Sequence, residues 1–199
     1  MQEENLTARR KRRRVLTTKR DETHPVAPNL LNRDFHAEEP NRKWVSDITY
    51  ISTKQGWLYV AVILDLYSRM VVGWSMSGNC DEGLVERALD LALARRRPAP
   101  GLLHHSDRGS QYTSRAYRAR LEQAGIIVSM SRKGNCWDNA AVESFFGSLK
   151  EECVRSTIYS SHAEARSELF PYLEAYYNRI RRHSALGYVS PVVYEQRGK

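Results

Sequence analysis

The sequence lacks the features of membrane and secreted proteins. No apolar run approaches the roughly 20 residues that a membrane-spanning helix needs. The first 20 residues contain no apolar stretch of the secretory-signal type. Cysteine is scarce, and Cys80, Cys136 and Cys153 do not stand near a second cysteine or a histidine at zinc-finger spacing. We therefore expect a cytoplasmic globular protein with neither a membrane segment, a zinc knuckle nor a disulfide framework.

Acidic residues are too few to balance the basic ones. The chain has 31 Lys and Arg against 23 Asp and Glu, for a formal net charge of +8. Much of this excess lies in residues 1–20, in a basic run that includes Arg12, Arg13 and Arg14. A basic arm attracts phosphate backbones without reading their sequence. We expect these arginines to contact DNA; the alternative is a solvated linker whose charge only aids solubility.

The chain divides into three parts by pattern. Residues 1–40 have no sustained hydrophobic periodicity and contain three prolines, so they are interpreted as a basic arm or linker. Residues 41–182 carry the periodic apolar patterns of a folded core, and residues 183–199 are expected to form an irregular tail. With 199 residues, 41% of them hydrophobic, one sizeable core is expected.

The core pattern begins with strands and then alternates strands with helices. Alternating and continuous apolar runs predict three meandering strands over 44–52, 57–69 and 70–77. Further predicted elements are a helix over 81–97, a strand over 102–107, a helix from a Thr113 or Ser114 cap to about 124, a strand over 126–131, a helix from an Asp138 cap to about 153, and a helix over about 161–182. This order predicts an α/β fold of the ribonuclease H type, with a mixed five-stranded sheet flanked by helices.

Three carboxylates stand out, although each has a plain structural explanation when taken alone. Asp47 interrupts a hydrophobic strand, where a buried unpaired carboxylate would cost several kcal/mol. Asp107 ends a predicted strand, at the kind of edge where ligands gather in α/β sheets. Glu143 lies on a predicted helix, on the same face as Lys150 two turns later. The alternatives are a solvent-facing strand residue, a turn former and an ordinary helix surface.

Together the three carboxylates can form one metal site. Two neighbouring strands can hold Asp47 and Asp107 side by side, and a helix crossing the sheet edge can bring Glu143 to them. Three like charges repel unless a divalent cation neutralises them. Hard oxygen ligands suit Mg²⁺, with Mn²⁺ as a substitute, and two such ions can hold a phosphodiester for in-line phosphoryl transfer. We therefore interpret these residues as metal ligands and catalytic residues.

Five segments resemble a known family. They are PVAPNLLNRDF (25–35), PNRKWVSDITYI (40–51), HHSDRGSQYTS (104–114), SRKGNCWDNAAVESFFGSLKEE (131–152) and YNRIRRHSALGYVSP (177–191). In these the chain resembles the DDE transposases of bacterial insertion sequences, in the group whose catalytic subunit is encoded in a second reading frame and carries a retroviral-integrase-like core. The 35 residues between Asp107 and Glu143 (108–142) match the spacing of that group and of retroviral integrases.

The resemblance implies a reaction and a set of site residues. The reaction is metal-dependent cleavage at the ends of a mobile element by water, followed by attack of the freed 3′-hydroxyl on another phosphodiester, without a covalent protein–DNA intermediate. Asp47, Asp107 and Glu143 are implied as metal ligands, and Lys150 as a DNA contact near the element end. Further candidate DNA contacts in the matching motifs are Ser110, Gln111, Tyr112 and Asn139. For Gln111 and Tyr112, loop-fixing hydrogen bonds and packing stay an equal alternative.

The implied partners are the DNA of the element ends, target DNA and further copies of this chain, in a protein associated with the bacterial nucleoid. Relatives of this kind usually carry a helix-turn-helix region before the core, or act with a partner subunit that binds the terminal repeats. Residues 1–40 show no convincing helix-turn-helix. Recognition of the element ends is therefore missing from this chain, supplied in trans or located in an absent N-terminal region.

Other functions and ligands are kept as alternatives. The carboxylates also suit a nuclease of the same fold that cuts without joining, and an inactive DNA-binding remnant is a further alternative. A tyrosine recombinase, suggested by 11 tyrosines, would need no divalent metal. His104 and His105 are poor zinc ligands because neighbouring strand residues point to opposite faces. Asp65 is interpreted as a turn former and not as a fourth ligand.

Overall fold

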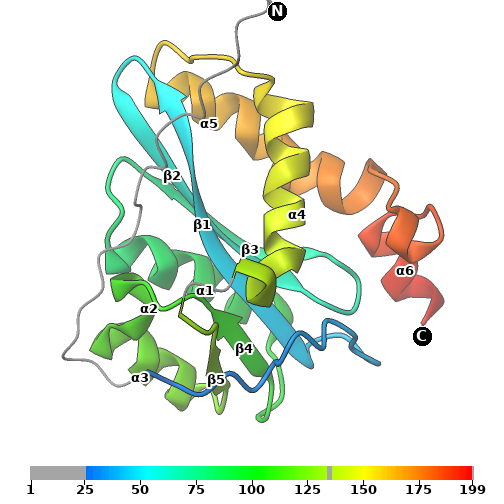
Figure 1. The fold of residues 1–199 in the computed structure, drawn as a ribbon. Helices are drawn as coiled ribbons and strands as arrows, with labels where there is room; N and C mark the ends of the chain where they lie inside the picture. Colours follow the sequence, from blue (N-terminus) through cyan, green and yellow to red (C-terminus); the bar gives the residue numbers. More distant parts are fainter. Residues whose placement is uncertain (1–25, 134–135, 199) are drawn as a thin grey trace, which may run out of the picture.

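The computed structural model describes residues 26–133 and 136–198 (Figure 1). The predicted DNA contacts Arg12, Arg13 and Arg14 lie outside these residues. A single sheet contains five strands, namely β1 (Lys43–Thr53), β2 (Gly56–Asp65), β3 (Val71–Ser77), β4 (Leu103–Ser106) and β5 (Ile127–Met130). Their order across the sheet is β3-β2-β1-β4-β5. The first three strands are antiparallel, whereas β4 is parallel to β1 and β5 is parallel to β4, which confirms the predicted mixed sheet.

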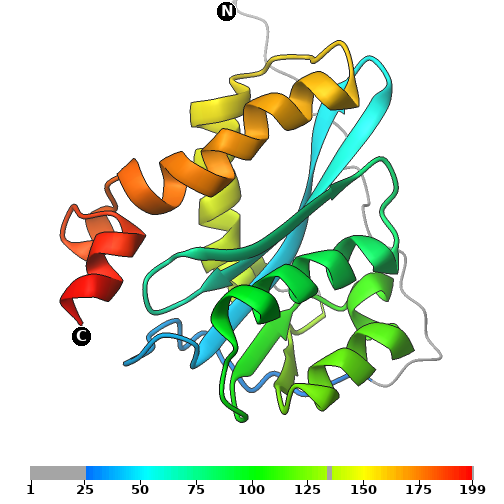
Figure 2. The ribbon, with the colours of Figure 1, turned by 180° about the vertical axis from the view of Figure 1, so that it is seen from behind.

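One face of the sheet is covered by α1 (Glu82–Arg96) and α3 (Arg115–Gln123), with the short α2 (Ser110–Thr113) before α3 (Figure 2). Asp81 caps α1 by accepting a hydrogen bond from the Leu84 N–H, and Ser114 caps α3 in the same way. Gly73 allows α1 to lie directly on β3, because a Cβ there would collide with the backbone of Ala88. Trp44 and Ile63 are buried in this core.

The other face carries α4 (Ala140–Leu149) and α5 (His162–Pro171), with the π-helical turns η2 (Lys150–Val154) after α4 and η3 (Tyr172–Ile180) after α5. Four apolar residues of α4 face the sheet, and α4 lies beside β1 (Figure 1). The helix predicted over 161–182 therefore changes its hydrogen-bonding pattern at Pro171. Proline has no N–H to donate to the preceding turn, which explains the change at this residue.

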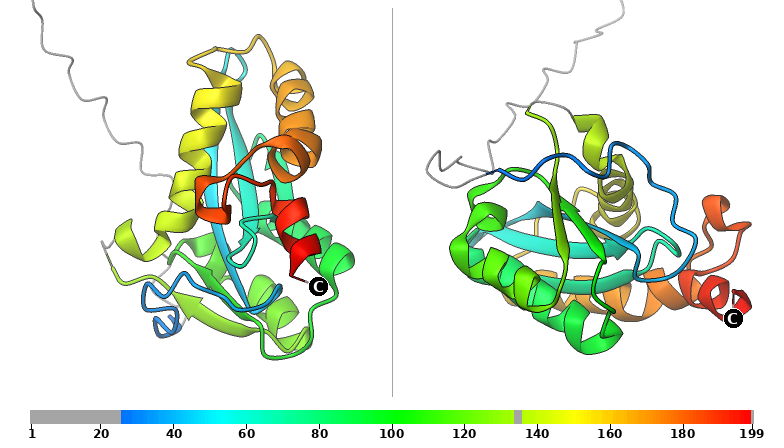
Figure 3. Two further views of the ribbon diagram at one scale, coloured as in Figure 1. Left: turned by 90° about the vertical axis from the view of Figure 1, so that its right-hand side faces the viewer. Right: turned by 90° about the horizontal axis from the view of Figure 1, so that it is seen from below.

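The ends of the described chain pack against the core. Leu31 is only 2% exposed, and its N–H donates to Ser129 Oγ, so residues 26–40 run along the core and do not stand apart as an arm. The prediction of an irregular tail is wrong for much of residues 183–198, which form η4 (Ser184–Leu186) and α6 (Pro191–Arg197) (Figure 3). Ser190 caps α6 and proline occupies its first turn, a local start signal that the sequence reading passed over.

The predicted cap at Asp138 is also wrong. Asp138 lies in the single turn η1 (Cys136–Asn139), and Asn139 precedes α4 without a side-chain capping bond. The buried Asp138 carboxylate instead accepts hydrogen bonds from Asn29 Nδ2 at 2.8 Å, Arg33 Nε at 3.0 Å and the Arg132 N–H at 2.9 Å. These long-range partners hold its pKa below the usual range although burial opposes the shift. Asp138 therefore anchors the start of α4 to the N-terminal segment.

Candidate active site

The parallel pairing of β1 with β4 brings two acidic residues together. Lys43 pairs with Leu103 and Val45 with His105. Continuing this register by two residues places Asp47 opposite Asp107, just beyond the last residue of β4. Both side chains are half-buried, in keeping with the prediction that neighbouring strands hold them side by side. The juxtaposition follows from sheet register and was not visible in either strand alone.

The electrostatics of this pair are unfavourable without a cation. Burial is the main cause that raises the pKa of Asp47 to about 8, and repulsion by Asp107 and, more weakly, Glu143 adds to it. Burial also raises the pKa of Asp107. One backbone N–H opposes each shift, since Ile48 donates to Asp47 Oδ1 and Gly109 to Asp107 Oδ1, both at 2.8 Å. The oxygen-only donor set and the crowding of negative charge fit a divalent cation.

Glu143 is brought toward this pair by α4 but does not close on it. The apolar side of α4, including Val142 and Phe146, packs on the sheet, which leaves Glu143 exposed on a flank of the helix. It lies close enough to raise the pKa of Asp47. Over residues 26–133 and 136–198, no three Asp, Glu, His or Cys side chains converge as a ready-made metal-binding group. Asp47 and Asp107 are therefore the preformed part of the candidate site, and Glu143 stands off from them.

Lys150 shares the flank of Glu143, as its position seven residues later predicts. Its ammonium group lies 5.2 Å from the centre of the Tyr50 ring, in a cation–π contact on β1. Burial lowers the pKa of Lys150, and the charge of Asp47 opposes that shift. The side chain nevertheless belongs to an exposed residue, so it is available at the edge of the acidic pair.

Gln111 and Tyr112 are packed into the protein. Tyr112 is 1% exposed, and its hydroxyl accepts a hydrogen bond from Ser46 Oγ at 2.8 Å. Gln111 is also buried, and its Nε2 donates to the backbone carbonyl of Cys80 at 2.8 Å. The packing alternative thus describes both side chains in this structure, and base stacking by Tyr112 would require its ring to leave the core. Ser110, the first residue of α2, is half-buried.

Asn139 connects the start of α4 to the acidic strand. Its buried side chain donates from Nδ2 to the backbone carbonyl of Ser46 at 3.3 Å, whereas Oδ1 has no hydrogen-bond partner among the residues of the structure that are described. Sequence reasoning missed Ser46, which binds both Asn139 and Tyr112. The alternation of side chains along β1 points to Ser46, because the residue next to Asp47 faces the opposite side of the sheet. Trp137, 68% exposed just before α4, was also not singled out.

The other titratable residues considered from sequence have structural partners. His104 Nε2 lies 3.0 Å from the Tyr117 hydroxyl, and His105 Nδ1 lies 2.8 Å from Ser129 Oγ. Burial lowers the pKa of His104 to about 3 and that of His105 to about 4, so both rings are neutral at pH 7. Asp65 accepts a hydrogen bond from the Tyr67 N–H at 2.9 Å, as a turn-forming residue does.

Comparison with known proteins identifies the family. Models of the integrase core domain match residues 37–136 and 124–191. The chain is 46% identical over 192 residues to the IS600 uncharacterized 31 kDa protein of Shigella sonnei, an alignment covering 96% of this chain and 71% of that protein. The chain belongs to the integrase-core transposases of insertion sequences. This transposase core is also 48% identical over 169 residues to the transposase for IS904 of Lactococcus lactis, covering 85% of this chain and 67% of that one.

Solved structures place the transposase core in the predicted fold class. The catalytic core of HTLV-2 integrase, in a trimeric form in complex with magnesium, superposes with a TM-score of 0.65 at 16% identity, over 80% of this chain and 99% of that chain. At this identity the likeness establishes the ribonuclease-H-like fold alone. In the described part of the transposase core, none of the helices has both the length and the apolar character required to span a bilayer.

Proposed function

We propose that this transposase core cleaves DNA and transfers the freed 3′-hydroxyl to a second phosphodiester, with Asp47, Asp107 and Glu143 as the metal ligands. The observation that carries the proposal is the β1–β4 register, which sets Asp47 opposite Asp107 in a half-buried position. The HTLV-2 integrase core, a protein of the same fold, is in complex with magnesium, which supports the use of a divalent metal.

The chain's own residues position the reacting groups. Asp47 and Asp107 are held by the sheet and by one backbone N–H each, so their carboxylates need little reorganisation. When bound at these carboxylates, Mg²⁺, as two ions for which Mn²⁺ could substitute, would supply positive charge for the attacking and the leaving oxygen. Glu143, carried by α4, would complete the ligand set. The raised pKa of Asp47 means that this carboxyl must lose a proton before it binds a cation near pH 7.

DNA contacts are proposed around this centre. Lys150 binds a phosphate near the element end, since its ammonium group lies over the Tyr50 ring on β1, near Asp47. Ser110, three residues after Asp107, is proposed as a further DNA contact, while Asn139 and Tyr112 act through Ser46 to hold α4 and β1 in place. Gln111 fixes the loop after β4 through its bond to Cys80. Arg12, Arg13 and Arg14 contact the phosphate backbone outside the core.

The transposase core is further proposed to act as a homo-oligomer on paired element ends, as a cytoplasmic protein associated with the nucleoid. The HTLV-2 integrase core is seen in a trimeric form, which supports self-association in this fold. Sequence-specific recognition of the ends is proposed to come from a partner subunit or from an N-terminal region.

A strand-transfer assay tests the proposal. The chain is incubated with a pre-cut duplex carrying a labelled 3′-hydroxyl end, a target plasmid and Mg²⁺. Joined products are expected from the unaltered chain, and their yield should fall at least about 100-fold in Asp107→Asn. Asp90→Asn is a matched control, because Asp90 lies on the exposed surface of α1 and pairs with Arg120. Mg²⁺-dependent thermal stabilisation gives a second readout, which Asp107→Asn should lose and Asp90→Asn should keep.

The outcomes separate the alternatives. Shortened products without joining would indicate a nuclease, and DNA binding without any cutting would indicate an inactive remnant. A protein–DNA adduct formed in the presence of a chelator would indicate tyrosine chemistry. Activity that survives in Asp107→Asn would overturn the assignment of the site.

A further inference from the structure

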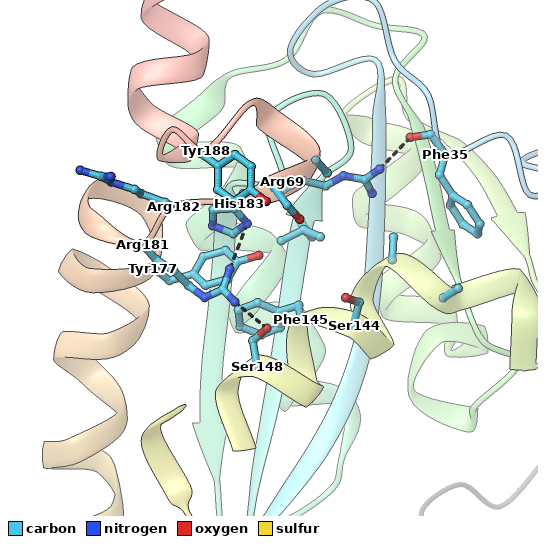
Figure 4. Close-up of a pocket in the computed structure, with 15 residues that line it drawn as sticks. Phe35, Arg69, Ser144, Phe145, Ser148, Tyr177, Arg181, Arg182, His183 and Tyr188 are labelled. Carbon is cyan, nitrogen blue, oxygen red and sulfur yellow. Dashed lines mark hydrogen bonds between the residues drawn. The ribbon is translucent and has the colours of Figure 1, made fainter. Parts of the chain in front are cut away.

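A pocket of about 570 Å³, which Glu143 does not line, lies beside α4 (Figure 4). Its walls come from α4, from η3 and the segment that follows it, and from the turn between β2 and β3. The pocket is open to solvent along one side. Its volume is in the range of sites that bind small molecules or single units of a polymer.

The lining of this pocket is cationic. It contains three arginines and no Asp or Glu, and His183 adds no charge near pH 7 because burial lowers its pKa to about 4. Two of the arginines are less available to a ligand in the pocket. Arg181 is neutralised by Glu152, with Nη2 at 2.7 Å from Oε1, and Arg182 extends away from the other labelled side chains in Figure 4. Arg69 is therefore the cation that the pocket offers to a ligand.

Arg69 is half-buried and short of partners. Its guanidinium group makes a long hydrogen bond of 3.4 Å from Nη2 to the carbonyl of Phe35, and no carboxylate in residues 26–133 or 136–198 forms an ion pair with it. Burial lowers the pKa of its guanidinium group. A partly desolvated cation without a counter-ion costs free energy unless a ligand supplies the negative charge. A guanidinium fork matches the paired oxygens of a phosphate group.

An outward ridge of α4 borders this pocket. Ala140, Ser144 and Gly147 form the ridge at i, i+4 and i+7, and all three are small. A Cβ built at Gly147 would meet nothing within 4 Å, so the protein itself does not require glycine there for space. Small side chains on an exposed ridge allow a polymer backbone to approach the helix closely.

We propose that the Arg69 pocket binds a phosphodiester of a DNA strand that crosses the outward ridge of α4 on its way from the acidic pair. The proposal rests on the proposed function, because that function places DNA at Asp47 and Asp107. Tyr188, 70% exposed at the pocket, offers its ring to the neighbouring sugar or base. The Ser144 and Ser184 hydroxyls, which also line the pocket, are further hydrogen-bond donors for phosphate oxygens.

Arg69→Gln tests the pocket, with Arg97→Gln as the matched control. Both arginines have a left-handed backbone, with φ of 59° and 43°, so the two changes remove the same charge from the same conformation. Arg97 is exposed and does not line the pocket. Binding of the full chain to a fluorescent duplex is measured over a range of salt concentrations. Arg69→Gln should weaken binding about tenfold at low salt and lower the log K against log salt slope by about 0.9, whereas Arg97→Gln should change neither.

A second measurement identifies the ligand. Inorganic phosphate should raise the melting temperature of the unaltered chain and of Arg97→Gln more than that of Arg69→Gln, and phosphate should compete with DNA for the unaltered chain. Arg69→Gln could bind DNA as tightly as the unaltered chain and yet lose the stabilisation by phosphate. In that case the pocket holds a free anion and the DNA proposal is wrong. If Arg69→Gln responds to DNA and to phosphate as the unaltered chain does, the pocket binds neither ligand and the proposal is wrong. Failure of the unaltered chain to bind DNA would instead count against the proposed function.

Discussion

The side-chain amide of Asn139 donates to the backbone carbonyl of Ser46, 3.3 Å away, and so fastens the turn just before α4 to the strand residue next to Asp47. Together with the apolar packing of α4 on the sheet, this bond joins the element that carries Glu143 to the element that carries Asp47. The position of the third carboxylate therefore depends on a residue that is itself buried and carries no charge.

Loss of this bond should lower strand-transfer activity strongly and folding stability only moderately. Asn139→Ala is expected to lower strand transfer at least about tenfold, because a small displacement of α4 moves Glu143 away from the acidic pair. It should cost about 1–2 kcal/mol of folding free energy, the usual range for a buried hydrogen bond. Product yield and denaturant unfolding measure the two effects. Asn79→Ala, at an exposed position, is the control. Equal losses in both variants would show that Asn139 has no special role.

Stability without metal should depend on pH through Asp47. The pKa of Asp47 is raised to about 8 in the folded state from an ordinary 3.8, so the folded state retains a proton that the unfolded state has released between these values. The chain should therefore lose stability as pH rises from about 4 to 8. Asp47→Asn removes this dependence, and its stabilising effect should be larger at pH 8 than at pH 5. Thermal unfolding in a chelator measures it, and a pH-independent difference would contradict the assignment.

The buried histidines should act in the opposite direction. Burial lowers the pKa of His104 to about 3 from 6.5, so the unfolded state takes up a proton first as pH falls. Stability contributed by the neutral ring is complete above pH 6.5 and is lost as pH falls toward 3. His104→Gln keeps a hydrogen-bonding group near Tyr117 but cannot be protonated, so its acid unfolding curve should be shifted to lower pH. An unshifted midpoint would show that other groups control acid unfolding.

Gly147 should be a position where stability and function conflict. Gly147→Ala places a methyl group in open space on α4 and should stabilise the helix by about 1 kcal/mol, the difference in helix propensity. If DNA crosses this ridge, the same change should lower DNA affinity, and Gly147→Leu should lower it further. Chemical denaturation and duplex binding measure the two effects. If Gly147→Ala is stabilised and both variants bind DNA as tightly as the unaltered chain, DNA does not pass close to Gly147.

Much of the site was predictable because its signals are local or fixed by spacing. The β-branched run around Asp47, the strand that ends just before Asp107 and the two-turn interval from Glu143 to Lys150 each reflect short-range geometry. The start of α6 was also encoded locally, by Ser190 followed by Pro191, but it was missed because the segment lacks a long periodic pattern.

The sequence by itself determined the order of strands and helices and the carboxylates that fit a metal. Only the tertiary structure decided that Asp138 anchors α4 and does not cap it, that Tyr112 lies in the core, and that Arg69 lines a pocket without a carboxylate. These outcomes depend on partners about 70 to 110 residues distant, such as Asn29 for Asp138 and Ser46 for Tyr112. Local periodicity reports which face of an element is apolar, whereas burial and pairing of a polar side chain depend on which distant segment packs against that face.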